Sequence, residues 1–243
     1  MGTLTVRSTG GDITLQRNVN VLNHVEMYSG NIYARANKAV VWATGAGSDV
    51  FMQARNSLVV QGTYGTNEIA VVRADRLVHP VAGDITLDGV VQVSNTATGR
   101  ILANAGNTLT IGGAGSIKSA KDIDLNAGAD LSWNRADLEA SIAREKLQGG
   151  QLVLRGQAML QADGNVALRS GGDVTIDADA NVTGVRDVTV REYTTKAVTI
   201  DVVKGYRRWP RAPCRCRRSA TRRPRSPSRW APSWSRSARS SRS

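Results

Sequence analysis

Short phrases that alternate apolar and polar residues recur through residues 1–204. Each phrase begins with a turn residue or two, usually ending in Asp or Asn, and continues as apolar–any–apolar. This alternation places successive side chains on opposite sides of an extended backbone, so every copy predicts a short strand after a turn. The copies are 11–15, 30–34, 48–52, 83–87, 121–125, 164–168, 172–176 and 186–190.

The spacing of these strands indicates a solenoid. Apolar pairs begin at Ile101, Leu109, Ile117, Ile123 and Leu131, at steps of 8, 8, 6 and 8 residues. Three such steps make a coil of roughly 22 residues, and equivalent strands of successive coils stack into ladders. We therefore predict that residues 1–204 are an all-β, right-handed parallel β-helix of about ten coils. A leucine-rich repeat or a propeller would require longer or differently patterned units.

Composition favours the same fold. The chain of 243 residues contains one Phe, and aromatic residues make up 5% of it. A large globular core usually contains many aromatic side chains, whereas stacked branched aliphatics fill a narrow coil and favour strands.

One segment departs from the strand pattern. In residues 134–148, Leu138 and Ile142 lie four positions apart, Asn134 can cap a helix, and Gly149 follows as a stop signal. We predict a short amphipathic helix here, standing out from the coil. The alternative is a loose excursion without helical structure. A binding role for this segment is a further hypothesis.

The C-terminal residues 205–243 have a different composition and charge. They contain 13 of the 32 basic residues, none of the 20 acidic ones, five of the six Pro and both Cys. Residues 1–204 therefore carry 19 basic and 20 acidic side chains, and the net charge of +12 comes from the tail. Because the tail lacks Leu, Ile, Val and Phe, it is predicted to be disordered.

Two origins for this Arg/Ser/Pro-rich tail are considered. We interpret residues 205–243 as out-of-frame or non-native translation, because such a composition is typical of a G+C-rich coding sequence read in the wrong frame. The alternative is a genuine basic arm that binds nucleic acid or an anionic membrane. The balanced charge of residues 1–204 does not favour nucleic-acid binding.

Several residue types are candidates for a catalytic or metal site. A row of carboxylates on a β-helix would suit a carbohydrate-active enzyme, but each Asp here follows a turn position, and turn formation explains it. His24 and His79 are isolated, and Cys214 with Cys216 supplies two of the four ligands of a structural zinc. We therefore predict no catalytic residue, cofactor or metal site. The carboxylates are Asp12, Asp84, Asp122, Asp173 and Asp187.

Polar strand positions are a candidate for a weak carbohydrate-binding surface. Thr side chains at the centres of several phrases are expected to point away from the interior, where a solvated strand face is the simpler explanation. These residues are Thr14, Thr86, Thr110, Thr175 and Thr189.

The repeated phrases at 83–87, 105–111 and 164–176 resemble the rod repeats of filamentous haemagglutinin. They are similar to those of two-partner-secreted adhesins and contact-dependent inhibition exoproteins of Gram-negative bacteria. The resemblance covers most of residues 1–204. It implies an extracellular stalk that presents binding or toxic ends, an outer-membrane secretion partner, and a receptor or glycan on a host or neighbouring cell.

The sequence therefore predicts a non-enzymatic stalk or adhesion segment. Met1 leads directly into a strand pattern without a signal-peptide pattern, so we expect an interior slice of a much larger exoprotein, whose export alone is doubtful. The alternatives are a β-helical carbohydrate-active enzyme and a basic-tailed binder of nucleic acid or membranes.

Overall fold

The computed structural model describes residues 2–34, 40–61, 71–113, 115–129 and 147–193. All of them belong to the first of two units into which the chain divides, Met1–Tyr206. Every regular element in these ranges is a β-strand. The predicted tail at 205–243 and nearly all of the predicted helix at 134–148 lie outside the described residues, so both stay predictions.

The strands wind into coils with three faces. The first face comprises β1 (Thr3–Arg7), the N-terminal part of β4 (His24–Ala34), the N-terminal part of β6 (Asp49–Val60), β8 (Arg76–Val81), β11 (Arg100–Ala105), β14 (Asp122–Ala127), β17 (Asn165–Ser170) and β20 (Asp187–Glu192). The second comprises β2 (Ile13–Leu15), the C-terminal parts of β4 and β6, β9 (Asp84–Leu87), β12 (Thr108–Ile111), β15 (Gln151–Leu154) and β18 (Asp173–Ile176). The third comprises β3 (Val19–Val21), β5 (Val40–Ala43), β7 (Val71–Ala74), β10 (Val90–Val93), β13 (Ser116–Ser119), β16 (Met159–Ala162) and β19 (Asn181–Gly184).

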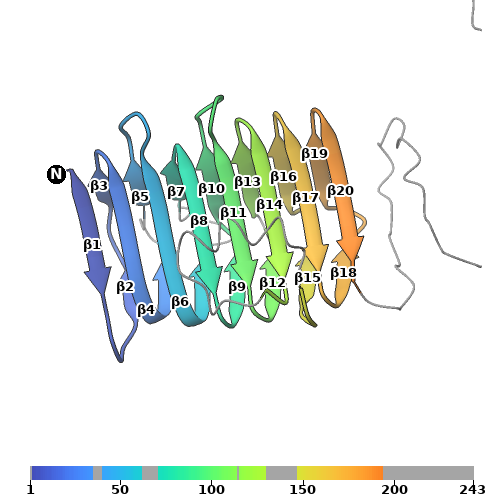
Figure 1. Ribbon diagram of the computed structural model, residues 1–243, viewed down its shortest axis with the longest axis horizontal. Coiled ribbons are helices and arrows are strands. Elements are labelled where there is room, and N and C mark those ends of the chain that lie inside the picture. Colours follow the sequence, from blue (N-terminus) through green and yellow to red (C-terminus); the bar gives the residue numbers. More distant parts are fainter. Residues whose placement is uncertain (1, 35–39, 62–70, 114, 130–146, 194–243) are drawn as a thin grey trace, which may run out of the picture. The chain divides into compact units, whose positions relative to one another are not determined.

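Each strand pairs in parallel with the equivalent strand of the neighbouring coil. Figure 1 shows first-face strands running downward in front and third-face strands behind them as the coils advance from the N-terminus, which is a right-handed winding. The third face has seven strands, one for each coil. The predicted parallel β-helix is therefore confirmed. The expected ten coils were too many.

Coil lengths explain that difference. Partner residues on the first face are mostly 21 to 27 positions apart, as in Thr3–His24 and Asp49–Arg76. Between β14 and β17 the interval is 43, as in Ile123–Val166. The extra residues follow β14, where Ala129 and Leu147 form an antiparallel bridge. The longer interval between β14 and β17 thus accounts for about one of the three missing coils.

Inward side chains form one continuous aliphatic core. On the second face, Leu109 lies between Ile85 and Leu152 in the ladder, and all three are fully buried. Branched side chains at successive inward positions pack against one another along the ladder, which favours strands and excludes water. The interior is therefore built by repetition of the same inward positions.

The repeated Gly at the coil corners has a steric cause. A Cβ at Gly83 or Gly172 would collide with a carbonyl oxygen of the preceding coil, at Asn56 and Gly150 respectively. Neither Gly83 nor Gly172 is among the glycines with positive φ. The corners thus use Gly for close stacking of backbones, and left-handed conformation is not required at these two positions.

The outer side of the first face carries a second apolar cluster, formed by Phe51, Val78 and Leu102, with Tyr28 packed against it. These side chains alternate with inward residues and therefore point away from the coil interior. Each of the three is nevertheless at most 2% exposed. The Tyr28 and Phe51 ring centroids lie 5.6 Å apart. The first face thus has buried apolar side chains on both sides.

Candidate functional site

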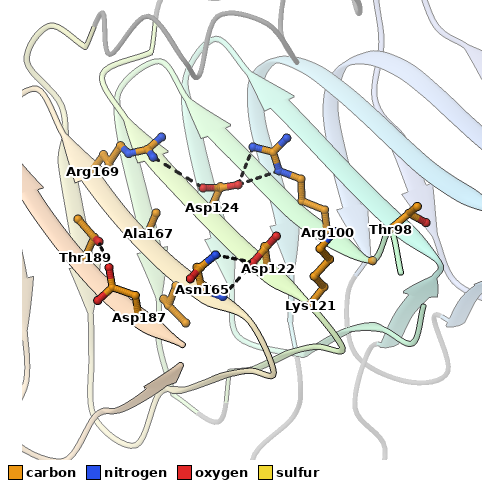
Figure 2. A pocket seen from close by; sticks show the side chains of 12 residues that line it. Thr98, Arg100, Lys121, Asp122, Asp124, Asn165, Ala167, Arg169, Asp187 and Thr189 are labelled. Atoms are coloured by element: carbon orange, nitrogen blue, oxygen red, sulfur yellow. Dashed lines mark hydrogen bonds and ion pairs between the residues drawn. The ribbon is translucent and has the colours of Figure 1, made fainter. Parts of the chain in front are cut away.

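A hollow of about 550 Å³ on the first face lies across β11, β14, β17 and β20. Figure 2 shows charged side chains projecting from these strands around the short Ala167. Alternation aims the side chains outward, and the short residues leave space between longer ones. The lining residues are Thr98, Gly99, Arg100, Lys121, Asp122, Asp124, Asn165, Val166, Ala167, Arg169, Asp187 and Thr189.

Asp124 is the centre of the charge network in this hollow. Its Oδ2 accepts a hydrogen bond from Arg100 Nε at 2.7 Å and lies 2.6 Å from Arg100 Nη2. Arg169 Nη2 lies 4.0 Å from the other oxygen, Oδ1. The Asp124 side chain is 12% exposed. Its charge is therefore offset by two guanidinium groups from adjacent coils.

The other carboxylates of the hollow also have structural partners. Asp122 Oδ1 accepts hydrogen bonds from the backbone N–H and the side-chain amide of Asn165, at 2.9 and 3.1 Å. Asp187 Oδ2 accepts one from Thr189 Oγ1 at 3.1 Å. Lys121 Nζ donates to the Ala97 carbonyl at 2.7 Å. The bonds of Asp122 and Lys121 connect successive coils, whereas the bond between Thr189 and Asp187 lies within one strand.

The five candidate aspartates do not form one row. Asp12, Asp84 and Asp173 precede or begin second-face strands, whereas Asp122 and Asp187 begin first-face strands. At the second-face corner, Asp12 accepts a hydrogen bond from Asn31, and Asp84 accepts one from Asn107. Asp12 and Asp84 thus connect successive coils at this corner.

The two histidines are also separated. His24 is half-exposed at a first-face corner, and its Nδ1 lies 2.8 Å from Asp49 Oδ1. His79 is fully buried at an inward position of β8, and neither ring nitrogen has a hydrogen-bond partner among the described residues. Burial lowers the pKa of His79 to about 4. The fold therefore favours the neutral imidazole inside an aliphatic column.

The five threonines of the candidate carbohydrate-binding surface are divided between two faces. Four of them share the outward column of the second face with Tyr33, Val59 and Val153. Thr189 lies on the first face in the hollow of Figure 2. The second-face column is a narrow strip of hydroxyl and methyl groups. Its threonines are Thr14, Thr86, Thr110 and Thr175.

Sequence reasoning missed a polar surface on the third face. A smaller hollow there has a volume of about 180 Å³ and is lined by side chains of β10, β13 and β16. Trp42 and Arg73 occupy the same outward column on β5 and β7. The sequence signal that could have revealed this surface is one polar or aromatic residue between small apolar residues, as in β5 and β7. The lining residues are Gln92, Val93, Ser94, Lys118, Ser119, Ala120, Gln161 and Asp163.

The described residues contain no group of three or more His, Cys, Asp or Glu side chains that could hold a metal ion. In the same part of the chain, no helix has the length and apolar character needed to cross a membrane. Comparison of the chain with protein-family models, curated proteins and solved structures finds no match in any of the three.

Proposed function

We propose that residues 1–204 form a stiff stalk or adhesion segment of a large bacterial surface exoprotein of the filamentous haemagglutinin type, without enzymatic activity. The observation that carries this proposal is the unbroken stacking of seven coils on one aliphatic interior. A coil of this kind contacts only its neighbours, so the structure extends in one direction.

Ladder hydrogen bonds support a mechanical role. They run between coils and therefore along the direction in which the coils stack. Bending or shortening the stack would break bonds in several strands together and would separate interior side chains that are fully buried. With a strand spacing of ~4.8 Å, seven coils contribute a spacer of roughly 30 Å.

The proposed location is the extracellular surface, where the full-length parent would be exported by an outer-membrane secretion partner. The proposed contacts are a receptor or glycan on a host or neighbouring cell. Nucleic acid is not expected as a partner, because residues 1–204 contain 19 basic and 20 acidic side chains.

Single-molecule stretching of the full chain, held at both ends, tests the mechanical role. We expect the coils to keep a fixed length at low force and then to open in steps. A coil of 22 residues releases about 75 Å of extended chain. Gradual lengthening from the lowest force, without steps, would contradict a stiff stalk.

Two further assays test adhesion and the absence of catalysis. Beads coated with the full chain should attach to epithelial or bacterial cells more strongly than albumin-coated beads; equal attachment would contradict the adhesive role. Release of reducing sugars from acidic polysaccharides, lost in Asp122→Asn, would instead establish an enzyme. Asp187→Asn is the matched control at the same first-face corner.

A further inference from the structure

We propose that the outward column of the third face is a binding site for a neutral, extended β-1,4-linked polysaccharide. The column consists of one side chain from each strand of the seven-stranded sheet, in register from coil to coil. Its members are Asn20, Trp42, Arg73, Gln92, Lys118, Gln161 and Thr183. This inference rests on the proposed adhesive function and names the ligand class and the surface.

Free hydrogen-bonding groups distinguish this column from the charged hollow of the first face. Gln92, Lys118 and Gln161 make no side-chain hydrogen bond or ion pair within the described coils. On the first face, by contrast, Asp124 and its neighbours are already paired. A ligand on the third face can therefore form new hydrogen bonds without breaking existing ones.

An exposed aromatic side chain lies at one end of the column. Trp42 is 37% exposed, and the Arg73 Cζ atom lies 5.5 Å from the centroid of the Trp42 ring. The cation–π contact holds the two side chains against each other and limits the rotamers of the indole. A fixed and exposed indole offers a flat apolar surface on which the C–H face of a pyranose ring can stack.

The hollow on β10, β13 and β16 supplies the polar contacts. Gln92 and Gln161 each provide an amide donor and an amide acceptor, Lys118 provides donors, and Asp163 provides acceptors. Each sugar hydroxyl is itself a donor and an acceptor, so this alternation suits a polyol. Among the residues that the structure describes, Lys118 and Asp163 are the only charged ones that line this hollow and their charges are opposite, so the hollow suits a neutral ligand.

A half-buried stripe runs beside the polar column. Val71, Val90 and Met159 are at outward positions two residues before Arg73, Gln92 and Gln161 in the same strands. The surface is therefore amphipathic across its width. A flat sugar chain presents C–H groups and hydroxyls in the same way, and can contact both strips together.

The repeat of the sheet sets the length of the ligand. Neighbouring strands are ~4.8 Å apart, which is close to the length of one equatorially linked pyranose unit. Five strand steps separate Trp42 from Thr183, so the column spans roughly 24 Å. A β-1,4-linked chain is straight enough to follow this line, whereas an α-linked chain curves away from it.

Calorimetric titration of the full chain with cello-oligosaccharides, from cellobiose to cellohexaose, tests the proposal. We expect affinity to rise with oligomer length and Trp42→Ala to lower the affinity for cellohexaose about tenfold. The double variant Gln92→Ala/Gln161→Ala should cause a similar loss. Thr175→Ala, an exposed outward position on the second face, is the matched control and should bind like the unmodified chain.

Three results would overturn the proposal. The first is no heat of binding with cellohexaose; the second is the same affinity in Trp42→Ala and Thr175→Ala. The third is binding of alginate or single-stranded poly(dT), abolished by salt, in the absence of cellohexaose binding, which would indicate recognition of charge. Stretching the same variants separates this outcome from failure of the stalk, since exposed substitutions should leave the unfolding steps unchanged.

Discussion

The outer sides of the first and third faces are built by the same alternation but differ in what they can do. On the first face, outward residues such as Phe51 and Leu102 are buried, and Asp124 is paired with Arg100. On the third face, Trp42 and Lys118 are exposed. The same strand pattern thus yields a second packed layer on one side and an open polar surface on another. Outward position alone does not decide whether a residue serves stability or binding.

The largest expected difference between these faces comes from their aromatic residues. Phe51→Ala should lower the free energy of unfolding by about 3–4 kcal/mol, because it opens a cavity in the buried outer cluster. Trp42→Ala should lower it by less than ~1 kcal/mol, since it removes one cation–π contact at an exposed site. Urea denaturation followed by far-ultraviolet circular dichroism measures both. Equal losses would show that the two outer surfaces are energetically alike.

The inner side of the first face contains a buried histidine within its aliphatic column. The fold favours the neutral form of His79, whose pKa is lowered from 6.5 to about 4 by burial. Stability from this residue is fully present above pH 6.5 and is lost as the pH falls toward 4, by about 3 kcal/mol in total. Below pH 4 this residue causes no further loss.

The variant His79→Leu isolates that effect from the titration of carboxylates. It should remove the His79 contribution to the pH profile and should be at least as stable as the unmodified chain at neutral pH, because the imidazole nitrogens have no partner among the described residues. Urea midpoints measured from pH 7 to pH 4 give the comparison. Parallel profiles for the two proteins would show that His79 gains a proton without cost.

Alternation was enough to predict the strands and the fold. All eight repeated phrases coincide with strands, and the parallel β-helix follows from their spacing. The pattern did not predict which face each strand belongs to. Asp12 and Asn31 share a corner, whereas Asp49 begins a first-face strand. Positions 12, 31 and 49 are spaced by 19 and 18 residues, two intervals that look alike. Only the first connects equivalent positions, because Asp49 pairs with His24 and not with Asn31.

The scarcity of aromatic residues correctly predicted a narrow aliphatic interior, but the sequence did not show where the single Phe lies. The chain has one Phe, and a narrow interior was inferred from that scarcity. In the structure, Phe51 lies outside the coil interior, in the outer cluster with Val78 and Leu102. Alternation cannot distinguish an outward residue that becomes covered from one that stays exposed. The outward residues of β5 and β7 were missed for another reason, since these two strands lack the Gly-Asp turn that marks other strands.

A smaller effect is expected from the charged part of the first face. Asp124→Asn should lower the free energy of unfolding by ~1–2 kcal/mol, because Arg100 and Arg169 lose the carboxylate that lies between them. Lys118→Met removes a charge from the third face at an unpaired position and should change stability by less than ~0.5 kcal/mol. Thermal denaturation at low and moderate salt compares the two. A larger loss of stability in Lys118→Met than in Asp124→Asn would contradict the conclusion that the charges of the first face are paired and those of the third face are not.

The smallest effect concerns the last described coil, where neither face has a further coil to pair with among the described residues. Glu192 Oε1 accepts a hydrogen bond from the Val174 backbone N–H at 2.7 Å, so a side chain occupies the place that a strand carbonyl takes elsewhere. Glu192→Ala should lower stability by about 1 kcal/mol, and Glu192→Gln, which keeps an acceptor, should lose less. Hydrogen exchange at the Val174 amide reports the change directly. Unchanged protection in Glu192→Ala would mean that the edge of β18 does not depend on this carboxylate.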